Sequence, residues 1–220
     1  MTRTRIKICG LTREADVDEA VEAGADAVGF VLYERSPRHL PLVRALELAR
    51  RLPPFVTPVL LFVNATPQAL RSACEEMPQA LLQFHGDETR EQCAAADRPY
   101  LRAARMAPGF DLLDFARLFH KVNGTSGARG AMALLLDAPV EGFGGGGKVF
   151  DWSLIPPSVP LPVVLSGGLS PANVSDGVLA VRPWAVDVSS GVEISKGLKS
   201  GPLMRRFCKA VREADDRINA

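Results

Sequence analysis

The stretch LPVVLSGGLSPANV (Leu161–Val174) contains a complete strand–turn–helix pattern. A short apolar run is followed by two glycines, and Ser170 then precedes Pro171, a pair typical of a helix start. A nearly continuous apolar run is expected where both faces of a strand are covered, as in a parallel sheet. The stretch therefore predicts one β/α unit, with a strand over 161–166 and a helix from residue 170 onward.

The same order of apolar run, turn and amphipathic stretch recurs along the chain. The predicted strands cover residues 5–9, 26–32, 55–63, 80–85, 100–105, 131–137, 161–166 and 184–189. The predicted helical stretches cover 12–24, 41–52, 66–77, 89–96, 110–122, 151–155, 170–180 and 201–218. These units in 220 residues fit the lower end of the size range of a (βα)8 barrel. The sequence thus predicts an α/β fold, a single TIM barrel over residues 1–220. An open doubly wound sheet is the runner-up, but no G-x-G-x-x-G follows the first strand.

The composition limits the functions open to the chain. Hydrophobic residues make up 47% and charged residues 23%, which suits a globular protein with a sizeable core. The formal net charge of +1 provides no broad basic surface, so nucleic acid is not an expected partner. Without an apolar run of signal-peptide or membrane-span length, the expected location is the cytoplasm, with no membrane partner. The four cysteines lie far apart, without zinc spacing, and free thiols fit a reducing compartment.

In a TIM barrel the active site lies at the C-terminal ends of the strands. The predicted strand ends carry Cys9, the segment 33–38, Asn64, His85, Asp137, Ser166 and Ser189. Most of these positions can transfer a proton or bind an anion. The sequence therefore predicts that chemistry is concentrated at this one rim.

Cys9 ends the first strand in RIKICG (Arg5–Gly10) and shares a face with Lys7, which points into the barrel. A buried cysteine is often only a small hydrophobic residue. A thiol nevertheless has an ordinary pKa of about 8.5, so a modest shift makes it a base or a nucleophile. Lys7 lies one pleat repeat deeper, and its predicted role is that of a charged member of the inner layer. The position of Cys9 at the rim favours a chemical role.

Two loops of small residues predict a phosphate site. Gly167 and Gly168 lack Cβ, so backbone N–H groups can approach a ligand closely, and the helix after them is expected to add free donors. Ser189, Ser190 and Gly191 follow the eighth predicted strand and can complete the cup. Phosphate sites in barrels are often built after strands seven and eight. The alternative is that the two glycines only form a turn.

Asp137 ends the sixth predicted strand and faces the barrel axis by alternation. A carboxyl group there is a candidate general acid if its surroundings keep it protonated. The alternative is a structural aspartate bonded to loop amides. The glycine run Gly144–Gly147 that follows is a candidate lid over a bound substrate.

Three further residues are candidate ligand-binding groups. Arg38 in ERSPRHL can hold a substrate carboxylate with two hydrogen bonds, and Arg35 is its rival. His85 can bind a ligand or cap its strand end. Asp187 can bind a hydroxyl or orient the loop amides. The three histidines lack metal-ligand spacing, so no metal site is predicted.

As a set, the motifs resemble those of the phosphoribosylanthranilate isomerase family of tryptophan biosynthesis, a family of single (βα)8 barrels. The resemblance is carried by KICG (7–10), GADAVGFV (24–31), SPR (36–38), FVN (62–64), Q-x-HG (83–86), the LLLD strand, GGGK-x-FDW (145–152), LSGGL-x-P-x-NV (165–174) and VDVSSGVE (186–193). Phe84 and the stretch 97–130 depart from the family pattern, but neither includes a candidate acid, base or phosphate-binding residue.

The resemblance implies roles for the matching residues. Cys9 is then the general base, Asp137 the general acid, and Arg38 the residue that holds the anthranilate group. The two loops of small residues become the phosphate cup, with Asp187 near the sugar. The implied reaction converts N-(5-phosphoribosyl)anthranilate to 1-(2-carboxyphenylamino)-1-deoxyribulose 5-phosphate by an Amadori rearrangement. Neither a metal nor an organic cofactor is expected, because the imine intermediate is itself the electron sink.

Two alternatives remain open from the sequence. A histidine-pathway isomerase catalyses a related rearrangement with a pair of aspartates, and Cys9 argues against that assignment. A non-catalytic phosphoribosyl-binding barrel would keep the cup without the chemistry, and the presence of Cys9, Asp137 and Arg38 argues against it. The expected partner is the small phosphosugar–anthranilate substrate, and the expected oligomeric state is a monomer.

Overall fold

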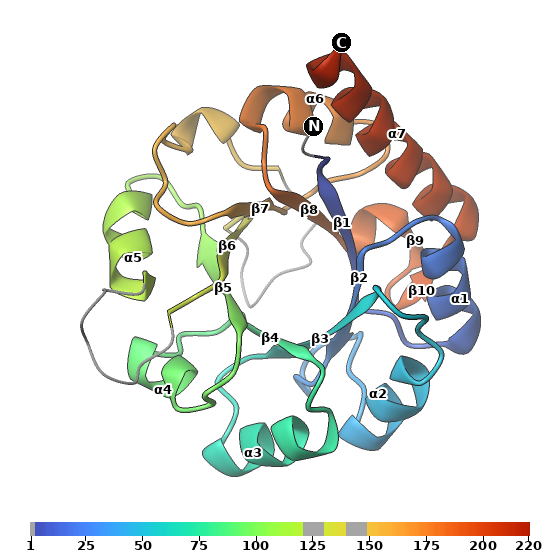
Figure 1. The fold of residues 1–220 in the computed structure, drawn as a ribbon, viewed down its shortest axis with the longest axis vertical. Coiled ribbons are helices and arrows are strands. Elements are labelled where there is room, and N and C mark those ends of the chain that lie inside the picture. The colour runs from blue at the N-terminus through green and yellow to red at the C-terminus, as the bar shows by residue number, and fades with distance from the viewer. Residues whose placement is uncertain (1–2, 121–129, 140–148) are drawn as a thin grey trace.

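The computed structural model describes residues 3–120, 130–139 and 149–220. Within these residues, eight parallel strands close into a barrel in sequence order (Figure 1), which confirms the predicted TIM barrel. The barrel strands are β1 (Arg5–Cys9), β2 (Ala27–Val31), β3 (Thr57–Phe62), β4 (Leu81–Phe84), β5 (Tyr100–Arg105), β6 (Ala133–Asp137), β7 (Val163–Leu165) and β8 (Ala185–Val188). Each observed strand lies within the range predicted for it.

Helices form the outer ring around the strands (Figure 1). They are α1 (Glu14–Glu22), α2 (Leu42–Ala49), α3 (Pro67–Glu76), α4 (Arg90–Ala94), α5 (Leu112–Phe119), α6 (Val174–Val181) and α7 (Gly201–Asn219). Two short 3-10 turns, η1 (Trp152–Leu154) and η2 (Ser190–Val192), follow β6 and β8. A small antiparallel hairpin of β9 (Glu193–Ser195) and β10 (Leu198–Lys199), which was not predicted, follows η2.

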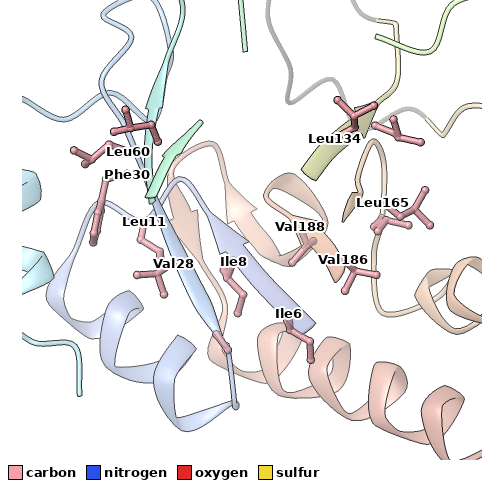
Figure 2. Packing of buried hydrophobic residues seen from close by; sticks show 14 of the residues in the cluster. Ile6, Ile8, Leu11, Val28, Phe30, Leu60, Leu134, Leu165, Val186 and Val188 are labelled. Atoms are coloured by element: carbon pink, nitrogen blue, oxygen red, sulfur yellow. The ribbon is translucent and has the colours of Figure 1, made fainter. Parts of the chain in front are cut away.

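The period of two along each strand separates two cores. Ile6 and Ile8 of β1 and Val186 and Val188 of β8 point outward, where they pack against the helices (Figure 2). Alternate residues point inward and form a separate apolar cluster, which includes Leu135 of β6. Because both faces of every strand are covered, the strands read as nearly continuous apolar runs. The same alternation directs Lys7 and Cys9 toward the barrel interior.

Helices α6 and α1 both begin later than predicted. Helix α6 begins at Val174 instead of Pro171, with Asn173 as its N-cap residue. The Asn173 side chain accepts a hydrogen bond from the N–H of Ser170 and donates one to the carbonyl of Gly168, which makes a turn of the segment between them. Helix α1 begins after Arg13, because the Thr12 hydroxyl donates to the carbonyl of Gly197 instead of capping the helix.

The two ends of the described chain meet on one side of the barrel (Figure 1). The backbone N–H and the hydroxyl of Thr4 donate to Asp215 of α7, at 2.8 and 2.6 Å. This contact holds the start of β1, which carries Lys7 and Cys9, against the last helix. Among the described residues, no helix is both long enough and apolar enough to cross a membrane.

Candidate active site

The thiol of Cys9 lies at the C-terminal end of β1 and is 5% exposed. It belongs to a small apolar cluster with Val31 of β2, Leu61 of β3 and Val63, which follows β3. Gly29 of β2 lies beside Cys9 in the sheet register. A Cβ at Gly29 would lie 2.6 Å from the Cys9 sulfur, so this glycine provides the space that the thiol occupies.

A buried ion pair lies beside this thiol. The Lys7 ammonium donates to Asp187 of β8 at 2.6 Å, and the Ser166 hydroxyl donates to the other Asp187 oxygen at 3.2 Å. Burial has the largest effect on Cys9 and raises the pKa of its thiol, whereas the charge and a hydrogen bond of Lys7 lower it. Burial opposes the charge of Lys7, but Asp187 and Cys9 together raise the pKa of its ammonium. The site therefore holds a protonated thiol at rest beside a cation that can stabilise the thiolate.

Replacing Gly29 with alanine is expected to lower kcat by displacing the Cys9 sulfur. Overpacking at such a site costs about 1–3 kcal/mol in the free energy of unfolding, and displacement of a catalytic group also slows the reaction. Gly24→Ala is the control for backbone strain without overpacking, since Gly24 has a φ of 93° but no atom lies within 4 Å of its added Cβ. Turnover and thermal unfolding of both variants check the prediction. Wild-type kcat in folded Gly29→Ala would contradict it.

The carboxyl group of Asp137 at the end of β6 is held at both oxygens. The N–H of Ala138 donates to Oδ1 at 2.9 Å, and Nε2 of His85 lies 3.0 Å from Oδ2. The other ring nitrogen of His85 lies 2.9 Å from the Gln83 amide nitrogen. The His85 ring therefore links Gln83 to Asp137 through its two nitrogens, and the tautomer of the ring sets which nitrogen donates.

This geometry makes His85 a partner of Asp137, which goes beyond the two roles expected for it. Gln83 received no role in the sequence analysis, although it belongs to the Q-x-HG motif. The available signal was the strand period, because residues two apart on β4 share a face.

The two predicted phosphate loops pack against each other and against the end of β6. Gly167 and Gly168 have φ values of 75° and 67°. A Cβ at Gly167 would lie 2.5 Å from the Ala138 nitrogen and 3.1 Å from Asp137 Oδ1. A Cβ at Gly191 would overlap the carbonyl oxygen of Leu169. Only backbone without a side chain fits at these places.

One part of the phosphate prediction is wrong. Helix α6 starts at Val174, so its N-terminus does not directly follow Gly168 as expected. The 3-10 turn η2 instead begins at Ser190, directly after Ser189. The backbone N–H groups available for a phosphate at this place are therefore those of Gly167–Gly168 and of Ser189–Gly191.

Replacing Gly191 with alanine is expected to raise the KM for a phosphorylated substrate by about tenfold or more. The new Cβ meets backbone, which cannot move aside without moving the loop. A hydrogen bond to a charged group is worth about 1.5–3 kcal/mol, so a misplaced donor has an effect of this size. Steady-state kinetics and inorganic phosphate binding check it, with Gly109→Ala as a positive-φ control whose added Cβ has no atom within 4 Å. An unchanged KM in the folded variant would contradict phosphate binding by these two loops.

Arg38 is buried at the rim, whereas its rival Arg35 is exposed. Arg38 Nε and Nη2 donate to the two carboxylate oxygens of Glu193 at 2.7 and 2.8 Å. Glu193 also accepts from the Lys199 ammonium at 2.7 Å. Neither Glu193 nor Lys199 was predicted as a site residue. Glu193 ends the VDVSSGVE motif, but Lys199 lies on the unpredicted hairpin and had no local signal.

The structure brings the predicted site residues together in one connected set. Asp187 contacts Lys7, whose ammonium lies beside the Cys9 thiol. Gly167 lies next to Asp137, and Asp137 contacts His85. Lys199 links the second phosphate loop to Glu193, the partner of Arg38, because it donates to both Ser189 oxygens and to the Glu193 carboxylate. The predicted glycine lid, Gly144–Gly147, lies outside the described residues.

This chain is similar in sequence to a family of known proteins. The family model for "N-(5'phosphoribosyl)anthranilate (PRA) isomerase" matches residues 6–210. A protein named N-(5'-phosphoribosyl)anthranilate isomerase from Leptothrix cholodnii is 71% identical, and the match covers 98% of this chain and 94% of that protein. A protein of the same name from Methylibium petroleiphilum is 68% identical, with 99% and 98% covered.

Two solved structures are similar in fold as well as in sequence. Phosphoribosyl anthranilate isomerase from Thermus thermophilus has a TM-score of 0.83 and 32% identity, and 96% of this chain and 99% of that chain are covered. A second phosphoribosyl anthranilate isomerase, solved with reduced 1-(o-carboxyphenylamino)-1-deoxyribulose 5-phosphate, has a TM-score of 0.76 and 34% identity with the same coverage. The sequence resemblance is thereby confirmed, and this chain belongs to the N-(5'-phosphoribosyl)anthranilate isomerase family.

Proposed function

We propose that this protein converts N-(5-phosphoribosyl)anthranilate to 1-(2-carboxyphenylamino)-1-deoxyribulose 5-phosphate, a step of tryptophan biosynthesis. The observation that carries the proposal is the meeting of three groups at one barrel rim. These are the thiol of Cys9 on β1, the carboxyl group of Asp137 on β6, and the paired loops after β7 and β8. A base, an acid and an anion site are what an acid–base rearrangement of a phosphosugar needs.

The first proposed step opens the sugar ring. Asp137 donates a proton to the ring oxygen, the bond between that oxygen and C1′ breaks, and the nitrogen lone pair forms a protonated imine. The N–H of Ala138 and the His85 ring hold the carboxyl group in place for this transfer. A positioned acid of this kind typically contributes about 10²–10⁴-fold to a rate.

The second proposed step moves a proton from carbon. Cys9, as thiolate, removes the proton from C2′, and the electron pair flows into the protonated imine to form an enolamine. The enolamine then tautomerises to the ketone. The Lys7 ammonium supports this step because its charge and hydrogen bond lower the pKa of Cys9 against the effect of burial.

The substrate is held at its two anionic ends in this proposal. The loops at Gly167–Gly168 and Ser189–Gly191 bind the phosphate through backbone donors, and Asp187 lies beside them with both oxygens engaged by Lys7 and Ser166. Arg38 binds the carboxylate of the anthranilate group. Fixing both ends between acid and base reduces the entropy cost of reaching the reactive geometry.

The test is the decay of substrate fluorescence in a coupled assay. Anthranilate and phosphoribosyl pyrophosphate are converted to the unstable substrate by a separate transferase, and this protein is then added. Decay is expected with wild type and not with Cys9→Ala or Asp137→Asn. No decay with folded wild type would refute the proposed activity, and turnover of the histidine-pathway substrate instead would favour the related isomerase.

Two broader features belong to the same proposal. The four cysteines are free thiols, which supports a reducing, cytoplasmic location. All the proposed site residues come from one barrel, which supports a functional monomer. Light scattering during gel filtration, combined with the activity assay at decreasing protein concentration, tests that state.

A further inference from the structure

We propose that Glu193 and Lys199 are positioning residues for Arg38. Glu193 directs one edge of the Arg38 guanidinium at the aromatic carboxylate of the substrate, and Lys199 connects Glu193 to the phosphate loop. The proposal rests on the function proposed above, because it assigns Arg38 a ligand. It adds two residues from the β9–β10 hairpin to the determinants of substrate specificity.

The first observation is the way in which Arg38 is held. Its Nε and Nη2 donate to the two oxygens of Glu193, and the side chains of both residues are almost fully buried. A guanidinium has further donors on its Nη1 side, and this second edge can form another pair of parallel hydrogen bonds. Among the described residues, no hydrogen bond from Arg38 Nη1 is present. Glu193 therefore fixes one edge and leaves the other for a planar carboxylate.

The second observation is that Arg38 packs closely against the strand that carries the proposed base. A Cβ at Gly10 would overlap Arg38 Cδ, and it would lie 3.2 Å from the Ser189 hydroxyl. Gly10 directly follows Cys9 and has a φ of 77°. The Arg38 side chain thus packs against the residue that follows Cys9, close to Ser189 of the second phosphate loop. A small displacement of Arg38 would change where a ligand lies relative to Cys9.

The third observation is the role of Lys199 as a bridge. Its ammonium donates to Glu193 Oε1 at 2.7 Å and to the Ser189 carbonyl and hydroxyl at 3.0 and 3.3 Å. Burial lowers the pKa of Lys199, and the Glu193 carboxylate opposes that change. Burial also opposes the charge of Glu193, but the two cations outweigh it and lower the pKa of its carboxyl group. One carboxylate between two cations leaves one positive charge, which matches one carboxylate of a ligand.

A merely structural role is the competing explanation, because buried ion pairs occur without any ligand to position. The two explanations differ in which ligand is affected. A structural defect weakens binding of every ligand of this rim, whereas misdirection of Arg38 weakens binding only of ligands with the carboxylate. The test therefore needs two ligands that differ in this one group.

The experiment is isothermal titration calorimetry with two stable compounds. One is reduced 1-(o-carboxyphenylamino)-1-deoxyribulose 5-phosphate, and the other is the same compound without its carboxyl group. The proteins are wild type, Glu193→Gln, the double variant Glu193→Gln/Lys199→Met, and the exposed control Arg35→Met. The double variant removes both partners of one buried pair, which matters because a single removal leaves an unpaired buried charge.

Wild type and Arg35→Met are expected to bind the carboxylated compound about tenfold or more tightly than its counterpart. Glu193→Gln is expected to lose most of that preference while binding the counterpart within about twofold of wild type. The double variant is expected to lose the preference too and to bind the counterpart more weakly, because Lys199 also donates to Ser189 of the phosphate loop. Equal weakening for both compounds in Glu193→Gln, or a retained preference in either folded variant, would overturn the proposal. If wild type binds neither compound and has no isomerase activity, the proposed function itself is refuted, which is a different result.

Discussion

Replacing Cys9 with serine is expected to lower kcat by about 10²–10⁴-fold while leaving the fold and substrate affinity largely intact. Serine has nearly the same shape as cysteine, and its hydroxyl can accept a hydrogen bond from Lys7. A hydroxyl does not ionise near neutral pH, however, so the base is lost. Single-turnover rates, substrate KM and the melting temperature of the variant together check this prediction.

Cys208→Ser provides the matched control, because Cys208 is also buried but packs in α7 away from the rim. It is expected to change stability and to leave kcat near the wild-type value. If Cys9→Ser retains the wild-type rate, or only unfolds, then Cys9 is a packing residue.

The pH dependence of the rate is a separate consequence of the Cys9 environment. Burial raises the pKa of the thiol despite the opposing effect of Lys7, so the reactive thiolate is the minor form at neutral pH. The wild-type kcat/KM is therefore expected to increase with pH as the thiol ionises, and this rising limb is expected to be absent from residual Cys9→Ser activity. A wild-type profile without a rising limb between pH 6 and 9 would exclude thiolate formation as the source of the base.

Replacing Asp137 with asparagine is the second change with a large expected effect, a loss of about 10²–10⁴-fold in kcat. The amide has no proton acidic enough to donate to the ring oxygen, so ring opening loses its acid. The fold is expected to tolerate the change. The asparagine oxygen can accept from Ala138, and its amide nitrogen can donate to His85 Nε2 when the ring proton lies on Nδ1.

The control for Asp137→Asn is Asp216→Asn, an exposed aspartate on α7. Chemical quench at high substrate concentration measures the bond-breaking step directly, and circular dichroism checks the fold. Wild-type kcat in the Asp137 variant would exclude this carboxyl group as the acid and would leave His85 as the next candidate.

Much of the fold could be predicted from local sequence because its signals are local. The period of two along a strand identified the inward faces of Lys7, Cys9 and Asp137, and short apolar runs between amphipathic stretches located every barrel strand. The cap at Thr66 was also predictable, since its side chain accepts from the N–H of Ala69 as the sequence pattern indicates. The start of α6 was not, because the Asn173 side chain bonds the backbone around it into a turn.

The sequence by itself determined the α/β alternation, the strand faces, the glycine loops and the identity of the residues at the rim. Only the tertiary structure decided which of these groups touch. Lys7 pairs with Asp187, His85 with Asp137, and Arg38 with Glu193, and the members of these pairs are 180, 52 and 155 residues apart in the chain. Propensity and periodicity describe interactions within a few residues, whereas these contacts form only when the barrel closes and brings the strand ends into one ring. The charges, hydrogen bonds and burial that adjust each group follow from that closure.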